Sequence, residues 1–159
     1  MKLRIQKLHP AASVPAYATE GAACFDLVAA TVDGSVNFGS YVQPDEPLTC
    51  GTGLAFEVPE GFVMLVFSRS GHGFRNGVRL SNCVGVIDSD YRGELMVQLT
   101  QDDRHDAELL DALITFVQPG DRIAQALLLP VPHCTFEVAE QLTLTERGVG
   151  GFGSTGVAA

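Results

Sequence analysis

The sequence has few basic residues for its length, and this shortage limits what the protein can bind. Its 10 lysines and arginines stand against 19 aspartates and glutamates, which gives a formal net charge of −9. Nonspecific binding to DNA or RNA relies on a broad basic surface that displaces condensed counterions, so we expect no nucleic-acid partner. A polyanionic ligand would require the few arginines to be concentrated at one cleft, or a divalent cation to screen the charge.

Long hydrophobic runs and metal or redox motifs are also missing. No apolar run approaches the ~20 residues that a membrane span needs, and the first residues alternate charged with apolar side chains. We therefore expect no membrane association and a cytoplasmic location. The cysteines form no CxxC pair and the histidines no HExxH spacing, so zinc and redox motifs are absent. All four cysteines are expected to be small buried residues: Cys24, Cys50, Cys83 and Cys134.

The residues that are present favour one compact domain of short strands. The chain has 159 residues and is 46% hydrophobic, enough apolar material for a core. Several strand-length segments are partly apolar or β-branched and are bounded by Gly, Pro or Asp: residues 2–8, 24–29, 53–58, 62–67, 95–100, 123–129 and 135–139. Short strands with frequent turns predict an all-β sandwich or barrel.

Helical patterns are scarce. Residues 106–113 favour a short helix, because Asp106 can cap its start and three leucines share one face. A second short turn is expected after Ser70. No internal repeat or inter-domain linker is visible, so we expect a β-domain over residues 1–146 and a glycine-rich arm over residues 147–159.

The arm reads RGVGGFGSTG over residues 147–156. Glycines let backbone N–H groups approach phosphate oxygens, an arginine supplies a forked cation, and a phenylalanine offers a face for a base. The alternative is a terminus without function, the commoner fate of glycine-rich tails. The segment is not a Walker loop, because no GK[ST] follows.

Two further segments combine arginine with glycine. Ser68-Arg69-Ser70-Gly71 follows an expected strand and suits a phosphate, although an isolated tripeptide of this kind is more often a solvated turn. Residues 118–125, QPGDRIAQ, form a Pro-Gly turn that enters a strand, and alone they favour a structural role.

Acidic residues gather in a fourth segment, GVIDSDYRGE, over residues 85–94. A carboxylate near phosphate can hold magnesium, or it can accept a proton from an attacking water, which contributes ~10²–10⁴ in rate. The alternative is an inert surface turn. Asp26 interrupts an apolar strand, and a buried acid usually needs a partner.

Taken in order, these segments resemble the five motifs of the homotrimeric dUTPase family, over nearly the whole chain. GVIDSDYRGEL and RGVGGFGSTG carry the likeness most specifically, and the Asp26 segment least. The resemblance implies a jelly-roll-like all-β domain with one or two short helices. It also implies hydrolysis of dUTP to dUMP and pyrophosphate, which limits uracil in DNA and supplies dUMP for dTMP synthesis. The flexible arm would close over the active site.

The resemblance assigns roles on the base side of the substrate. Asp88 would activate the water that attacks the α-phosphate. Asn82 and the backbone of Val86 and Ile87 would meet the uracil edge. Tyr91 would pack on the deoxyribose and exclude a ribose 2′-OH, which discriminates against UTP. The same substrate-binding group includes Met96.

On the phosphate side, the resemblance implies contacts from two loops and the arm. Asp26 would hold the water shell of a Mg²⁺ ion on the triphosphate. The phosphate contacts would come from Arg69, Ser70, Gly71 and Gln125. The arm would contribute Arg147, Phe152, Gly153, Ser154 and Thr155, with the phenylalanine stacked on uracil. Three subunits would share each active site, so an isolated copy should be nearly inactive.

The sequence departs from the family pattern at three places, none of which removes a motif's polar group. Cys24 stands where glycine is usual, and Ser68 where proline is usual. Residues 101–117 form a longer, acidic connection, which is either a harmless surface loop or a site for another partner. The alternatives to a dUTPase are a dCTP deaminase, a nucleotide-binding regulatory protein and a β-sandwich without a ligand.

Overall fold

The computed structural model describes residues 1–43, 45–102 and 115–151. Most of the described strands belong to two four-stranded antiparallel sheets. The first sheet has the order β3-β5-β10-β8: Thr31–Val32, Leu48–Gly51, Met96–Gln101 and Val78–Leu80. The second has the order β2-β12-β7-β9: Phe25–Val28, Arg122–Pro130, Phe62–Phe67 and Val84–Ile87. Two ribbons complete the body, β1 (Arg4–Lys7) with β6 (Leu54–Glu57) and β4 (Ser40–Val42) with β11 (Thr115–Val117).

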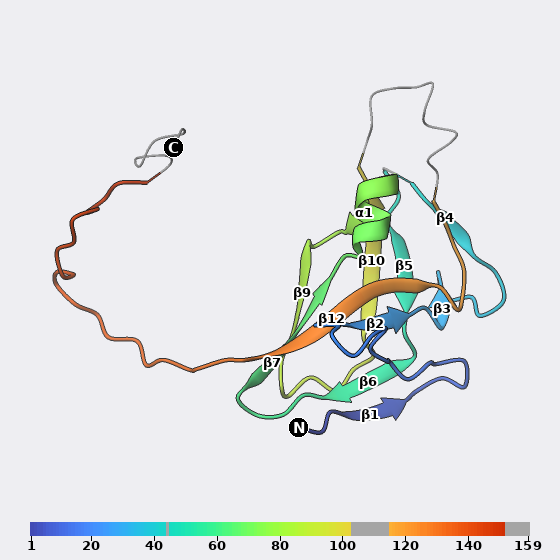
Figure 1. Ribbon diagram of the computed structural model, residues 1–159, viewed down its shortest axis with the longest axis horizontal. Helices are drawn as coiled ribbons and strands as arrows, with labels where there is room; N and C mark the ends of the chain where they lie inside the picture. The colour runs from blue at the N-terminus through green and yellow to red at the C-terminus, as the bar shows by residue number, and fades with distance from the viewer. Residues whose placement is uncertain (44, 103–114, 152–159) are drawn as a thin grey trace.

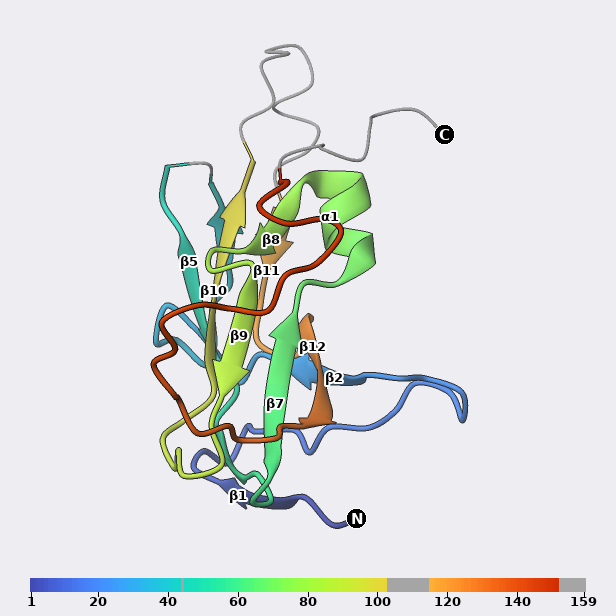
Figure 2. The same cartoon turned by 90° about the vertical axis from the view of Figure 1, so that its left-hand side faces the viewer.

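The core is one cluster formed by residues of both sheets. Strands such as β2, β7 and β10 direct alternate residues into it. β7 buries Met64 and Val66, and β10 buries Val97 and Leu99. This pattern confirms the expected all-β, jelly-roll-like fold in its sandwich form, with the two sheets on either side of the core (Figure 2).

A short helix, α1 (Ser70–Asn76), begins where β7 has ended and confirms the turn expected after Ser70. It ends at Gly77, whose φ of 66° is left-handed and whose N–H donates to the Gly73 carbonyl at 3.0 Å. The helix expected at residues 106–113 lies outside the described residues. In the described part of the chain, no helix is long and apolar enough to span a membrane.

The strand expected at residues 135–139 is wrong. Beyond Pro130 the chain leaves the body of the domain, and Phe136 and Val138 are at least 95% exposed (Figure 1). The segment has the composition of a strand, but a strand forms only where another backbone supplies hydrogen-bond partners. Within the described residues of one copy, none does.

The cysteine prediction is correct for one of the four. Cys50 is fully buried on β5, and burial raises the pKa of its thiol to about 12, with smaller effects from Asp33 and Asp121. Cys24 is half-buried, whereas Cys83 and Cys134 are exposed, so their burial was predicted wrongly. Small size permits burial, but Cys83 lies in the loop between β8 and β9 and Cys134 lies beyond the end of β12, and both are exposed there.

Candidate active site

The turn after β9 carries the carboxylate expected to act as the base. Asp88 directly follows Ile87, the last residue of β9, and is exposed. The Tyr91 N–H donates to the Asp88 carbonyl at 3.3 Å, and Arg92 Nη1 donates to the Ser89 carbonyl at 2.7 Å. Among the described residues, no cation forms an ion pair with the Asp88 carboxylate. The Asp88 carboxylate is therefore accessible to a ligand or a water molecule.

Two pockets of about 290 Å³ each flank β9. Val86, Ile87 and Met96 line both of them. The structure thus brings together the predicted residues that we call the β9 site: Asn82, Val86, Ile87, Asp88, Tyr91 and Met96. These residues combine apolar side chains with an amide and a carboxylate. Such a lining suits a ligand that has a planar part with hydrogen-bonding groups at its edge.

Local sequence explains how this site is shaped. Gly85 lets β9 approach β7 closely, since a Cβ there would lie 3.1 Å from the Cβ of Val66. Tyr91 is fixed in the turn because its hydroxyl donates to the Glu94 carbonyl at 3.0 Å and its ring lies against Gly93. The tyrosine ring is therefore held at the edge of the site before any ligand arrives.

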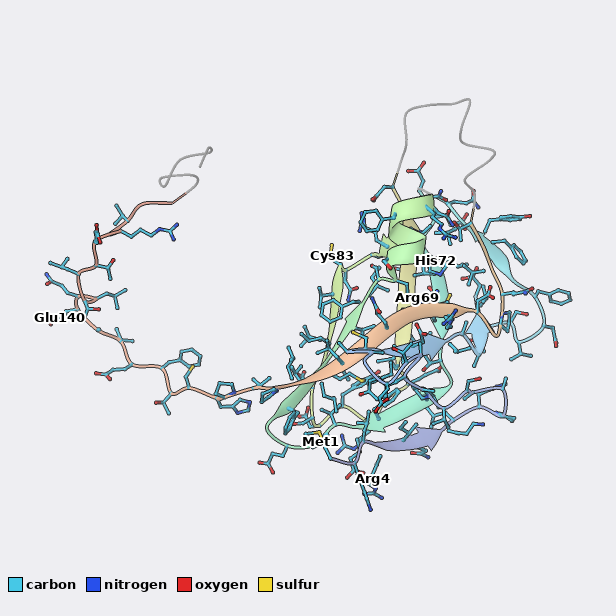
Figure 3. The ribbon with its side chains drawn as sticks, viewed as in Figure 1. Met1, Arg4, Arg69, His72, Cys83 and Glu140 are labelled. Atoms are coloured by element: carbon cyan, nitrogen blue, oxygen red, sulfur yellow. The ribbon has the colours of Figure 1, made fainter. Side chains whose placement is uncertain are left out.

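A second group of charged residues lies between α1 and the start of β12. Asp26 accepts from Arg69 Nε at 3.0 Å through Oδ1 and from Arg122 Nη1 at 3.1 Å through Oδ2. The Arg122 carbonyl accepts from Arg69 Nη1 at 3.3 Å and lies 3.0 Å from His72 Nε2. Figure 3 shows Arg69 and His72 close together at the start of α1, the helix that contains His72. We call Asp26, Arg69, His72 and Arg122 the arginine cluster.

Gln125 and the loop before α1 are tied to this cluster. On β12, Gln125 pairs with Asp26 on one side and Phe67 on the other, and its Nε2 donates to the Ser68 carbonyl at 2.9 Å. The Ser68 hydroxyl accepts from the Leu80 N–H at 2.9 Å, so this departure from the family pattern replaces proline with a hydrogen bond to β8. At the other departure, burial and the Asp26 carboxylate raise the pKa of the Cys24 thiol.

Within one copy, the β9 site and the arginine cluster lie apart. β7 and β9 are antiparallel, with Met64 opposite Ile87, so Asp88 lies next to Val63 while Arg69 lies beyond the far end of β7. At ~3.3 Å per residue, the two positions are about 20 Å apart along the strand. The predicted residues therefore form two groups rather than one continuous site.

Residues 131–146, which lead from β12 to the glycine-rich arm, extend away from the body, and most of their large apolar side chains are exposed. Phe136, Leu142 and Leu144 are each at least 87% exposed. Figure 3 shows Glu140 far from the labelled residues of the body. Arg147 Nε donates to the Gly150 carbonyl at 2.8 Å, which closes a local turn. The remaining predicted arm contacts lie outside the described residues: Phe152, Gly153, Ser154 and Thr155.

A family model described as dUTPase matches residues 11–156. The chain belongs to the dUTPase family. A deoxyuridine 5'-triphosphate nucleotidohydrolase from Nautilia profundicola is 42% identical, covering 98% of this chain and 99% of its own. One from Coxiella burnetii is 40% identical, covering 98% and 95%.

Solved dUTPases have the same fold. The Staphylococcus bacteriophage 80alpha dUTPase with dUpNHpp has a TM-score of 0.82 and 25% identity, covering 98% of this chain and 99% of its own. A dUTPase from phage phi11 of S. aureus, described with a structural Mg(II) ion, has a TM-score of 0.71 and 22% identity, covering 89% and 98%.

Among the described residues of one copy of this dUTPase, no three His, Cys, Asp or Glu residues lie close enough together to hold a metal ion. Asp26, the residue expected to reach the ion through water, faces two guanidinium groups. Each of its oxygens keeps further acceptor capacity, so a hydrogen bond to a water molecule is compatible with these pairs.

Sequence reasoning missed Arg122 and His72, which this dUTPase joins to the predicted Asp26 and Arg69. Arg122 stands inside the QPGDRIAQ segment, which alone favoured a structural role. The signal that could have identified Arg122 was Asp26, because a half-buried carboxylate needs a cation as partner. The chain has few arginines, so few candidates for that partner existed. His72 gave no signal, because its partner is a backbone carbonyl.

Proposed function

We propose that dUTP is hydrolysed to dUMP and pyrophosphate by a water molecule that Asp88 activates for attack on the α-phosphate. The observation that carries this proposal is the grouping of an exposed carboxylate with the amide, apolar and tyrosine side chains of the β9 site. General-base catalysis contributes ~10²–10⁴ in rate, the share assigned to Asp88.

The base and sugar bind at the β9 site in this proposal. The uracil edge is hydrogen-bonded by Asn82 and the backbone of Val86 and Ile87, with Met96 beneath the ligand. Tyr91 packs on the deoxyribose, where a ribose 2′-OH would lose its water without gaining a partner. Support comes from the Tyr91 hydroxyl, whose proton is already donated to the Glu94 carbonyl and is not available to a ribose 2′-OH.

The triphosphate contacts the loop before α1 and the start of β12. Arg69 supplies a forked cation, and Ser70, Gly71 and Gln125 supply neutral donors. Mg²⁺ enters as part of the substrate, bound to phosphate oxygens whose charge it neutralises, and Asp26 contacts its water shell. Magnesium retains water readily, which supports an outer-sphere contact. The cytoplasm, favoured by the sequence, is the proposed location.

Each active site is shared between copies in a homotrimer. In one copy, the backbone positions of Arg69 and Asp88 are about 20 Å apart at ~3.3 Å per residue. This separation supports a site in which Asp88 and Arg69 of different copies contact one dUTP. The exposed apolar side chains of residues 136–144 support the same assembly, because another copy could bury them.

The arm then closes over bound substrate. Phe152 stacks on uracil, while Arg147, Gly153, Ser154 and Thr155 contact the terminal phosphate. Ordering such a segment costs conformational entropy, which the charged contacts offset.

Replacing Gly93 by Ala tests the role of Tyr91. A Cβ at this position would lie 2.6 Å from Tyr91 Cζ, so the ring must move. We expect a lower kcat/KM for dUTP and a smaller ratio of dUTP to UTP turnover, by about tenfold. Steady-state kinetics on both nucleotides measures the ratio. The exposed Gly21→Ala, whose added Cβ meets nothing, is the control, and an unchanged ratio in Gly93→Ala would remove Tyr91 from sugar selection.

Product analysis tests the proposed function. The purified protein and Mg²⁺ are incubated separately with dUTP, UTP and dCTP, and the products are separated by chromatography. We expect dUMP and pyrophosphate from dUTP alone. Deamination of dCTP would favour the deaminase alternative, and binding of nucleotide without turnover would favour a regulatory protein.

A further inference from the structure

We propose that Arg122 is a second phosphate-binding arginine of the active site, contacting the terminal phosphates of dUTP beside Arg69. This inference rests on the proposed function and adds a residue to it. It starts from an irregularity in β12. The pairing of β12 with β2 shifts between Arg122 and Ala124, so β12 contains a β-bulge at its first residues.

The bulge decides which way Arg122 points. Side chains alternate along a strand, and Ala126 and Ala124 are both buried, so a regular β12 would direct residue 122 into the core. Instead Ile123 is also buried, and the extra residue turns Arg122 outward, onto the face that carries Gln125 and Asp26. Bulges commonly re-aim a side chain next to an active site.

The charges of the arginine cluster require a second cation if it is to attract a triphosphate. Arg69 and Asp26 alone cancel each other, since Asp26 accepts from Arg69 Nε at 3.0 Å. With Arg122 included, the side chains of Asp26, Arg69 and Arg122 carry a net charge of +1, in a protein whose formal net charge is −9. The positive field that a polyanion meets at this place therefore depends on Arg122.

Arg122 also has donors to spare. A guanidinium carries five N–H donors, and among the described residues the Arg122 side chain uses Nη1 alone, toward Asp26. Its side chain is 54% exposed, against 25% for Arg69, which donates through both Nε and Nη1. Of the two arginines, Arg122 therefore has the more exposed guanidinium, and its side chain makes fewer hydrogen bonds.

The backbone of Arg122 holds Arg69 independently of its side chain. Arg69 Nη1 donates to the Arg122 carbonyl at 3.3 Å, and His72 Nε2 lies 3.0 Å from the same oxygen. A carbonyl can only accept, so His72 carries a proton on Nε2. Both contacts persist in any side-chain variant at position 122. A substitution there removes the second guanidinium while Arg69 keeps two of its partners.

The test compares triphosphate and monophosphate binding in Arg122→Met and Arg122→Lys. Titration calorimetry with Mg²⁺ measures the Kd of dUpNHpp, a dUTP analogue, and of dUMP, which lacks the terminal phosphates. We expect Arg122→Met to raise the Kd of dUpNHpp by about 10- to 100-fold, the value of a lost charge-assisted contact, and to leave the Kd of dUMP unchanged. Arg122→Lys, which keeps the charge without the fork, should lie between Arg122→Met and the unmodified protein.

The control is Arg75→Met, which removes one exposed positive charge from α1 outside the arginine cluster and should change neither Kd. Equal weakening of dUpNHpp and dUMP in Arg122→Met would indicate a structural role and overturn the inference, as would unchanged binding of dUpNHpp. If Arg122→Met does not fold, the same comparison in Arg122→Lys decides. Failure of the unmodified protein to hydrolyse dUTP would contradict the proposed function instead.

Discussion

Replacing Asp88 by Asn lowers the kcat for dUTP by roughly 10²-fold or more and leaves the affinity for dUTP nearly unchanged. The amide keeps the size of the side chain but cannot take a proton from water. The contacts with uracil, sugar and phosphates do not involve the Asp88 carboxylate, so binding persists. Single-turnover kinetics measures the hydrolytic step, and calorimetry with dUpNHpp measures affinity.

Asp90→Asn is the matched control for this variant. Asp90 is an exposed carboxylate of the same turn, and the proposed mechanism gives it no contact with dUTP. We expect its rate to stay close to that of the unmodified protein. Comparable turnover in Asp88→Asn and Asp90→Asn would remove Asp88 from the mechanism.

Ending the chain before Gly148 lowers turnover of dUTP by roughly 10²-fold, the loss typical of reacting groups that are no longer held in position. The truncation removes every proposed arm contact except Arg147. It leaves both four-stranded sheets and the apolar side chains of residues 136–144 in place, so the assembly should persist. Kinetics and size-exclusion chromatography with light scattering measure the two effects.

A shorter truncation, which removes only residues 157–159, separates the motif from the length of the arm. These residues follow the RGVGGFGSTG segment, and their loss should not change the rate. An unaltered rate after the longer truncation would show that the arm takes no part in closure. A truncated protein that no longer assembles would contradict the expected independence of assembly from the motif.

Strands with a strong local pattern were predictable from the sequence. β7 covers residues 62–67 as expected, because its apolar residues are bounded by Pro-Glu-Gly before and by Ser and Gly after. β12 differs from the expected 123–129 by one residue at each end. In both cases the local sequence and the tertiary structure favour the same conformation.

Other strands depend on partners that the local sequence does not reveal. β9 contains Gly85, which weakens a strand pattern, and forms because it pairs with β7, where a Cβ at Gly85 would lie 3.1 Å from the Cβ of Val66. Residues 135–139 show the opposite case: they have the composition of a strand but no partner strand within the described residues. Long-range pairing decided both outcomes.

The sequence predicted which residues belong to the candidate site but not how they are arranged, and their roles stay predictions. The motif order named the members of the β9 site and, near the arginine cluster, Asp26, Arg69 and Gln125, but not Arg122 or His72. Their separation follows from the register of β7 with β9, and the outward side chain of Arg122 from a bulge in β12. Neither the register nor the bulge can be predicted from one sequence, because each depends on the strand that pairs with it.

Mixing two inactive variants tests most directly that the active site is built from more than one copy. Asp88→Asn and Arg69→Met are each expected to be nearly inactive alone. They are unfolded together, refolded at equal concentrations and assayed with dUTP. If Asp88 and Arg69 of one site come from different copies, random assembly restores both in about a quarter of the sites, and activity returns to about that fraction. Activity that stays at the level of the separate variants would contradict the shared site.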